Sequence, residues 1–266
     1  MPSAVSVVTL LTDFGDRDYF VASMKGVILN INPQARIVDL SHQIAPQQVG
    51  DAAYLLGACY RYFPEGTVHV AVVDPGVGSA RRPLLVTTSR YFFLAPDNGL
   101  LTPIFDEELN VEARKIDNRQ YRLDSEGATF DGRDLFAPAA AWLTRGQQPG
   151  SFGPLIQDAV RLPGNEPTRD GPVLVGQVVY IDRFGNLITN ITAAHVQDMQ
   201  RSRKQGGVTF RLKGVHIEGL ASHYAAGSDT KPAGVINSNG QVEFFVKDGN
   251  CAELLKCRQG ERVEVV

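Results

Sequence analysis

Residues 5–40 read VSVVTLLTDFGDRDYFVASMKGVILNINPQARIVDL, and the expected fold follows from this stretch. Val5–Thr12 is an apolar, β-branched run of the kind found in buried strands, and it ends in the polar turn Asp13–Asp18. A helical stretch over residues 20–31 leads to a second strand-like run, Arg36–Leu40. A strand, a helix and a further strand in this order predict a parallel pair joined by a helical crossover.

The same alternation continues through the first half of the chain. Val49–Phe63 carries apolar residues at helical spacing, and Arg133–Thr144 reads as a helix closed by Gly146. Three further strand-like runs lie between these helices: Thr67–Val73, Arg82–Thr88 and Tyr91–Ala95. We therefore predict an α/β domain over residues 1–165, with a Rossmann-like, mostly parallel sheet that helices cover on both faces.

The second half has a different texture. Residues 147–172 are rich in proline and glycine, which is typical of a linker or a meandering connection. Short strand-like runs follow, separated by Gly, Asn and Asp turns: Val173–Ile181, Leu187–Ile191, Val208–Leu212, Gly234–Ile236, Val242–Val246 and Arg262–Val265. This pattern predicts a smaller, antiparallel, β-barrel-like domain over residues 166–266.

Composition excludes several classes of partner. The formal net charge is −3 and there is no Lys/Arg run, which argues against nucleic-acid binding through phosphate neutralisation. No apolar stretch approaches the ~20 residues that span a bilayer, and the first residues lack the basic flank of a signal peptide. Cys59, Cys251 and Cys257 form no CxxC pair and no zinc spacing, so we expect reduced thiols, no metal and a cytoplasmic location.

Polar residues gather where the predicted strands end. Asp13 and Asp18 follow the first strand, and the run from Asp74 to Arg81 follows the third. In open α/β sheets, ligands bind beyond the carboxyl ends of the strands. A carboxylate such as Asp13 can accept hydrogen bonds from both hydroxyls of a ribose, although it can equally cap a helix or form a turn. The sequence has no GxGxxG after a strand and no GxxxxGK[ST] phosphate loop.

Taken together, seven segments resemble the S-adenosyl-L-methionine (SAM) hydroxide adenosyltransferase family, which is related to the fluorinases and chlorinases. They run in order along the chain: LTDFGDRDYFVASMKG (11–26), VDLSHQI (38–44), FPEGTVHVAVVDPGVGSARRP (63–83), APDNGLLT (95–102), TFDGRDLFAPAAA (129–141), IDRFGNLITNI (181–191) and INSNG (236–240). The resemblance implies an enzyme that hydrolyses SAM by water attack at the ribose C5′, giving adenosine and L-methionine. It also implies no cofactor, and a homotrimer with its sites between neighbouring subunits.

The resemblance assigns roles by position. Asp13 corresponds to the carboxylate that holds the ribose hydroxyls, and Asp18 to a ligand of the methionine amino group. Four further positions correspond to segments that contact the adenine and methionine ends of the substrate: Asp182, Phe184, Asn186 and Ser238.

The family's water-activating group is an Asp–Arg–His set, and this chain departs from it. Asp74 and Arg81 match the first two members, but Asp131 stands where the family has histidine. We expect Asp74, oriented by Arg81, to hold the water opposite the sulfur, with Asp131 sharing that task. Two neighbouring acids tend to keep one proton between them, and Arg81 or Arg133 is expected to offset their repulsion.

Three other functions compete with hydrolysis. A halogenase would offer halide a dry pocket with an aromatic residue in place of Asp74 and a serine in place of Gly132, whereas a carboxylate repels halide. A non-catalytic adenosyl-binding protein would follow if Asp131 disabled the site. A divalent-metal hydrolase would be built on Asp13, Asp16, Asp18 and Asp74, because hard cations prefer oxygen ligands. The resemblance accounts for these acids without a metal, so the sequence favours the hydrolase.

Overall fold

The computed structural model describes residues 7–125, 127, 129–164, 166–201 and 207–266. The chain divides into two compact units, the first ending at Leu162 and the second beginning at Pro163. The boundary predicted at residue 165 lies three residues beyond this division, and residue 165 itself is outside the described residues. Each unit is described here by itself.

The first unit is built on a seven-stranded sheet in the order β2-β1-β3-β5-β4-β6-β7. The strands β2, β1, β3 and β5 run parallel to one another, and the remaining strands add on antiparallel. The predicted α/β class with a Rossmann-like, mostly parallel sheet is confirmed, and antiparallel strands complete one edge. The strands are β1 (Val7–Thr12), β2 (Arg36–Ser41), β3 (Val68–Val72), β4 (Pro83–Thr87), β5 (Phe92–Pro96), β6 (Glu112–Lys115) and β7 (Leu155–Ile156).

The turn between β4 and β5 explains the antiparallel edge. Only residues 88–91 separate the two strands, and the Thr88 amide donates to the Tyr91 carbonyl at 3.0 Å. A connection this short joins antiparallel neighbours, since a parallel pair needs a crossover of about a dozen residues.

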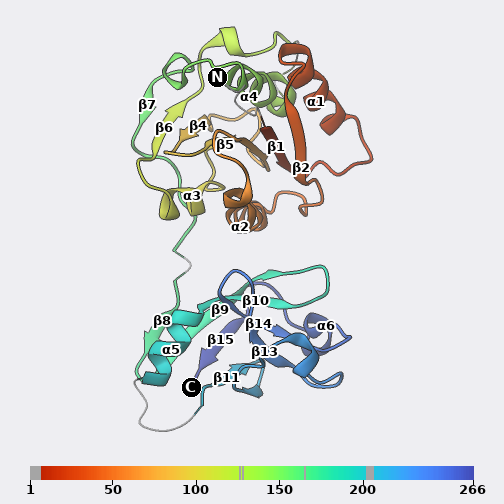
Figure 1. Ribbon diagram of the computed structural model, residues 1–266, viewed down its shortest axis with the longest axis vertical. Helices are drawn as coiled ribbons and strands as arrows, with labels where there is room; N and C mark the ends of the chain where they lie inside the picture. Colours follow the sequence, from red (N-terminus) through yellow and green to blue (C-terminus); the bar gives the residue numbers. More distant parts are fainter. Residues whose placement is uncertain (1–6, 126, 128, 165, 202–206) are drawn as a thin grey trace. The chain divides into compact units, whose positions relative to one another are not determined.

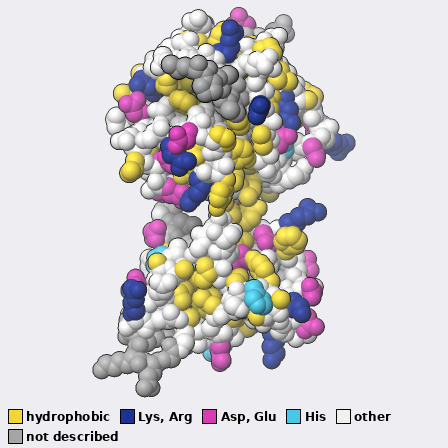
Figure 2. Space-filling model, in the orientation of Figure 1, with side chains coloured by type: hydrophobic (Ala, Val, Ile, Leu, Met, Phe, Trp, Pro, Cys, Tyr) yellow, Lys and Arg dark blue, Asp and Glu magenta, His cyan; other side chains and the backbone are white. Residues whose placement is uncertain are grey.

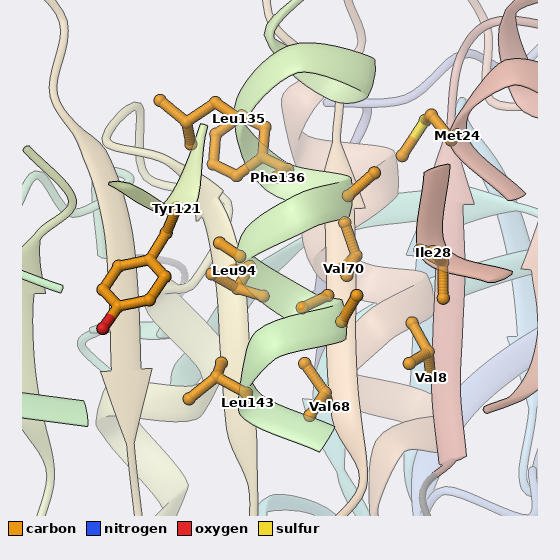
Figure 3. Close-up of a cluster of buried hydrophobic side chains, with 14 of the residues drawn as sticks. Val8, Met24, Ile28, Val68, Val70, Leu94, Tyr121, Leu135, Phe136 and Leu143 are labelled. Atoms are coloured by element: carbon orange, nitrogen blue, oxygen red, sulfur yellow. The ribbon is translucent and has the colours of Figure 1, made fainter. Parts of the chain in front are cut away.

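Helices cover both faces of this sheet (Figure 1). On one face, α1 and α4 bury side chains such as Met24, Ile28 and Leu143 against Val8 and Val70 of the strands (Figure 3). On the other face, α2 and α3 close a second apolar cluster. The helix predicted over 49–63 ends at Cys59 and continues as a 3₁₀ turn. The helical segments are α1 (Phe20–Ile31), α2 (Val49–Cys59), α3 (Thr102–Glu107), α4 (Ala137–Thr144), a π-helical turn (Gly132–Phe136) that leads into α4, and 3₁₀ turns at Tyr60–Tyr62, Arg119–Tyr121 and Pro149–Ser151.

The second unit is an eight-stranded antiparallel sheet in the order β12-β11-β15-β9-β10-β14-β13, with β8 paired to β9. A bridge between Ala221 and Val235 joins the segment after β12 to β13, so the sheet nearly closes on itself. The predicted antiparallel, barrel-like fold is confirmed. Its elements are β8 (Thr168–Asp170), β9 (Val173–Ile181), β10 (Leu187–Thr192), α5 (Ala193–Arg201), β11 (Thr209–Leu212), β12 (Val215–Glu218), a 3₁₀ turn (Tyr224–Ala226), β13 (Ala233–Ile236), β14 (Gln241–Phe245), α6 (Cys251–Leu255) and β15 (Arg262–Val265).

The surface shows no concentration of one charge on the face drawn in Figure 2, where basic and acidic side chains are interspersed. Within the described part of the chain, no helix combines the length and the apolar character needed to cross a bilayer.

Candidate functional site

The predicted acids of the first unit lie at one edge of the sheet. Parallel pairing of β1 with β3 places Thr12 opposite Val72. Asp13 directly follows β1, and Asp74 follows β3 by two residues. Because the carboxyl ends of parallel strands meet at the same edge, both side chains emerge on the side where ligands of such sheets bind.

Asp74, Arg81 and Asp131 form one cluster, although they come from two distant segments. Arg81 Nη2 lies 2.5 Å from Asp74 Oδ2 and also pairs with Asp131 Oδ2. The loop between Asp74 and Arg81 is tightly turned: the Gly76 amide donates to Asp74 Oδ1, and a β-carbon on Gly76 would lie only 3.3 Å from Arg81 Cγ. A small residue at position 76 therefore lets Arg81 fold back onto Asp74.

The cluster is largely withdrawn from solvent. The exposed fractions of the side chains are 5% for Asp74, 11% for Arg81 and 13% for Asp131. Burial opposes the charge on Arg81, but its hydrogen bonds with the two carboxylates raise the pKa of its guanidinium. Arg81 Nε is buried and has no acceptor among the described residues, so it is a free donor inside the cluster.

A second arginine, which sequence reasoning did not single out, touches the cluster. Arg122 Nη2 lies 3.4 Å from Asp131 Oδ1. Arg133, expected as a balancing cation, instead pairs with its neighbour Asp134 at 2.6 Å and stacks over Phe130. The two carboxylates are therefore balanced by Arg81 and Arg122. No motif marked Arg122, because only the fold brings its side chain to Asp131.

Asp13 is held by a backbone amide. Its Oδ2 accepts from the Gln47 amide at 2.9 Å, and Oδ1 accepts no hydrogen bond from the described residues. Asp18 is exposed, five residues further along the same loop. One oxygen of Asp13 is thus positioned while the other remains available to a ligand.

Aromatic side chains connect the Asp13 loop with the Asp131 turn. Phe14 lies 5.8 Å, ring centre to ring centre, from Phe130, and Phe20 lies 5.2 Å from Phe130. Gly132 packs beneath them: a β-carbon there would lie 3.2 Å from Phe14 and 3.1 Å from Phe130. These contacts bring Asp13 and the catalytic candidates into one region of the first unit.

The site residues predicted in the second unit lie in two turns, in which Phe184 and Ser238 are exposed and Asn186 is buried. Asp182 Oδ1 accepts from the amides of Phe184 and Asn186, both at 2.9 Å, and Asp182 Oδ2 accepts from the Asn186 side chain at 3.0 Å. Phe184 is 71% exposed, which excludes core packing within this unit. Ser238 is exposed in the turn between β13 and β14, next to Asn237, which accepts the Gln241 amide. The Asp182 carboxylate and the Asn186 side-chain amide thus stabilise the turn, whereas Phe184 and Ser238 are exposed.

Over residues 7–266, leaving out 126, 128, 165 and 202–206, no group of three or more His, Cys, Asp or Glu side chains has an arrangement suited to a metal ion.

Comparison with known proteins gives a consistent result for both units. A model of the SAM hydroxide adenosyltransferase N-terminal domain matches residues 8–153, and a model of the C-terminal domain matches residues 176–264. An (R)-S-adenosyl-L-methionine hydrolase from Salinispora arenicola is 35% identical over 97% of both chains. A fluorinase from an Actinoplanes species is 30% identical over 74% of each chain. The crystal structure of an uncharacterized conserved protein from Thermotoga maritima superposes with a TM-score of 0.89 at 31% identity, covering 97% of this chain and 99% of that one.

Proposed function

The chain belongs to the SAM hydroxide adenosyltransferase family and is a SAM hydrolase, and we propose that Asp74, Arg81 and Asp131 hold its attacking water. The reaction is a displacement at the ribose C5′ that gives adenosine and L-methionine. The bond from the water oxygen to C5′ forms as the C5′–sulfur bond breaks. The water proton passes to a carboxylate of the cluster and then to solvent.

The buried Asp74–Arg81–Asp131 cluster carries this proposal, because it suits what the reaction demands. The leaving group is a neutral thioether, so no general acid has to assist its departure. The site has to align a partly dehydrated water and accept its proton. Alignment lowers a barrier by roughly 7–11 kcal/mol in favourable cases, and general-base help contributes about 10²–10⁴ in rate. Asp74 is more buried than Asp131, and it is fixed by its ion pair with Arg81.

Asp131 takes over the place of the family's histidine in this proposal. An unprotonated carboxylate offers a hydrogen-bond acceptor, as an imidazole does, but it adds a negative charge. Arg81 lies between the two acids and Arg122 contacts the far oxygen of Asp131. The positive charges of the two arginines therefore offset the repulsion between the two acids, whose oxygens can accept hydrogen bonds from water.

Halide transfer is the competing reaction, and two features disfavour it. Two carboxylates in the nucleophile region repel chloride and fluoride. At position 132, where the resemblance places a serine in the fluorinase, this chain has glycine, and a β-carbon there would lie 3.1 Å from Phe130 and 3.2 Å from Phe14. A serine at this position would therefore have to displace the neighbouring rings slightly.

We assign the remaining residues to substrate binding. Asp13 accepts from the ribose hydroxyls through its free oxygen, and Asp18 binds the methionine amino group. The adenine and methionine ends are contacted by residues of the second unit, namely Asp182, Phe184, Asn186 and Ser238. The exposure of Phe184 supports this assignment, since an aromatic ring left uncovered within its own unit is available to stack on an adenine or to pack against another subunit.

We further propose a homotrimer in which each site lies between neighbouring subunits, as the family resemblance implies, with SAM as the small-molecule substrate and no cofactor. A cytoplasmic location is supported by the three free cysteines, Cys59, Cys251 and Cys257.

One incubation tests the reaction. Purified protein is mixed with SAM in oxygen-18 water, with and without a chelator and with and without chloride, and products are separated by chromatography and mass spectrometry. We expect adenosine labelled at the 5′-hydroxyl under all conditions. Unlabelled adenosine would rule out direct displacement, chloroadenosine would identify a halogenase, and loss of activity in chelator that added metal restores would identify a metal hydrolase.

A pair of variants tests the proposed roles. Asp74→Asn should lower turnover by roughly 10² or more while SAM still binds. The exposed Asp170, on β8, provides the matched control, and Asp170→Asn should behave as wild type. Equal turnover of Asp74→Asn and wild type would remove Asp74 from the mechanism.

A further inference from the structure

A chain of polar contacts lies behind the Asp13 loop. Lys25 Nζ of α1 lies 2.6 Å from Asp39 Oδ2 of β2. His42 Nε2 lies 3.0 Å from Asp39 Oδ1, and His42 Nδ1 lies 2.8 Å from Thr12 Oγ1. Thr12 is the last residue of β1 and is fully buried, and the His42 side chain is 9% exposed. These contacts therefore connect the half-exposed Lys25 with the buried hydroxyl of Thr12, directly before Asp13.

The chemistry of the groups sets the direction of these hydrogen bonds. Partial burial opposes the charge of Asp39, but hydrogen bonds from Lys25 and His42 lower its pKa, so at neutral pH this carboxylate only accepts. His42 Nε2 faces this acceptor, so we assign the ring proton to Nε2 and let Nδ1 accept the hydroxyl proton of Thr12. Thr12 Oγ1 is left to accept the Phe14 amide at 3.2 Å. Thr12 Oγ1 is thus held between His42 and the Phe14 amide, which fixes the rotamer of Thr12 and the backbone next to Asp13.

The segment that carries His42 grips the Asp13 loop at further points. The His42 carbonyl accepts the Gly15 amide at 2.8 Å, and Gly15 has the left-handed φ of +66° that favours glycine. Five residues after His42, the Gln47 amide donates to Asp13 itself. The backbone after Asp13 is thus held through the Phe14 and Gly15 amides, and the Asp13 carboxylate is held by the Gln47 amide.

We propose that His42 is a positioning residue for ribose recognition, acting through Thr12 and Gly15 on the carboxylate of Asp13. This inference rests on the proposed assignment of Asp13 to the ribose hydroxyls. Breaking the His42–Thr12 contact should therefore weaken ribose recognition more than it affects the rest of the site. Among the described residues, none of the four side chains in this network (Lys25, Asp39, His42 and Thr12) contacts the Asp74–Arg81–Asp131 cluster.

The same strand supplies a matched control. Thr9, three residues before Thr12 on β1, makes an equivalent contact: its Oγ1 lies 2.8 Å from Nδ1 of His69, which is buried on β3. Thr9→Val and Thr12→Val therefore each remove a threonine hydroxyl of β1 that contacts a histidine Nδ1. Only Thr12 adjoins the Asp13 loop.

The test compares the binding of adenosine and 2′-deoxyadenosine by isothermal titration calorimetry. Wild type should bind adenosine about tenfold more tightly, since the deoxy compound lacks one hydroxyl that donates to a carboxylate. Thr12→Val and His42→Ala should bring this ratio close to one. Thr12→Ser keeps the hydroxyl and should keep the ratio, as should the control Thr9→Val, even where Thr9→Val lowers the melting temperature. In SAM turnover, Thr12→Val should raise KM with little change in kcat.

The outcomes separate this inference from the function on which it rests. A wild-type protein without preference for adenosine would overturn the ribose assignment of Asp13, and the positioning role with it. A preference that persists in both Thr12→Val and His42→Ala would overturn the positioning role alone. Loss of the preference in Thr9→Val as well would mean that general destabilisation is the cause, and this too would reject the role of His42.

Discussion

Asp131 differs from a histidine in charge as well as in shape, and its surroundings in this chain match that difference. Its two oxygens face two guanidiniums, one from Arg81 and one from Arg122. A neutral imidazole would bring no charge that has to be balanced. In this chain the negative charge of Asp131 is balanced by the two guanidiniums that contact it.

Removing the charge of Asp131 while keeping its shape should slow the reaction. We expect Asp131→Asn to bind SAM as wild type does and to turn it over roughly tenfold or more slowly, within the range of general-base effects. Asp131→His should retain activity but lose it as pH falls below ~6.5, where an imidazole gains a proton. Stopped assays from about pH 5 to 9, together with calorimetric SAM binding, check both variants. Wild-type turnover of Asp131→Asn over this range would leave the water to Asp74 and Arg81.

Arg122 should have a smaller effect that depends on Asp131. Its side chain is 39% exposed and its contact with Asp131 is 3.4 Å long, so solvent screens the pair. Arg122→Gln should lower kcat only a few-fold. In a double-mutant cycle, adding Arg122→Gln to Asp131→Asn should cost nothing more, because the charge that Arg122 balances is already gone. Additive effects on kcat would place Arg122 elsewhere in the mechanism.

His69 predicts how stability depends on pH. It lies in β3, stacked on Phe93 and 1% exposed, and burial lowers its pKa from 6.5 to about 3. The unfolded chain therefore binds one more proton than the folded chain between these values, and stability is lost as pH falls below about 6.5. The slope reaches about 1.4 kcal/mol per pH unit.

Urea unfolding at pH 7 and pH 5 measures this effect of His69. Wild type should lose about 2 kcal/mol more than His69→Phe over this interval, since phenylalanine suits the surrounding aromatic side chains and has no proton to gain. Comparison with the variant removes the contribution of other titrating groups. Equal losses in the two proteins would show that His69 is not held neutral by the fold.

At the scale of elements, the π-helical turn Gly132–Phe136 shapes the site. It begins directly after Asp131 and leads into α4, and its first residue packs against Phe14, Phe130 and Met24. Because these side chains pack closely against Gly132, a side chain at position 132 would push the aromatic rings out of place. The turn thus couples the placement of Asp131 to the aromatic side chains beside Asp13.

Two glycine substitutions in this unit should have opposite signs. Gly132→Ala places a β-carbon 3.1 to 3.2 Å from buried neighbours and should destabilise by about 1 kcal/mol or more. Gly26→Ala, in the exposed interior of α1 with no heavy atom within 4 Å of the new carbon, should stabilise by about 0.5–1 kcal/mol. Thermal unfolding of both variants checks the pair. Stabilisation by Gly132→Ala would mean that the aromatic rings can move aside at little cost.

At the scale of the whole molecule, the proposed site draws on both units of the chain. The catalytic candidates and Asp13 belong to the first unit, and the candidates for adenine and methionine contacts belong to the second. The full chain should run as a trimer by light scattering. Proteins comprising residues 1–162 and 163–266 alone should not bind SAM in calorimetry. A fully active monomer, or SAM binding by one isolated unit, would contradict the shared site.

Local pattern was sufficient for much of the fold. The bounds expected for α1, β9 and β15 agree with the structure, because apolar periodicity and turn residues act between neighbours in sequence. The same holds for the α/β and barrel-like classes of the two units. The candidate site residues of the first unit also follow from the sequence, because they lie in the family motifs and at the ends of predicted strands.

Other features depend on contacts between distant residues, which no local pattern encodes. His42 reaches Thr12 because β2 pairs with β1, and Arg122 contacts Asp131 only in the folded first unit. Thr12 and Thr9 are alike in the sequence, yet Thr12 adjoins the Asp13 loop and Thr9 is enclosed in the core with His69. The sequence by itself determined the fold classes of the two units, the bounds of several elements and the family that the chain resembles. Only the tertiary structure decided which side chains share a charge or a hydrogen bond, because packing brings together residues that are far apart along the chain.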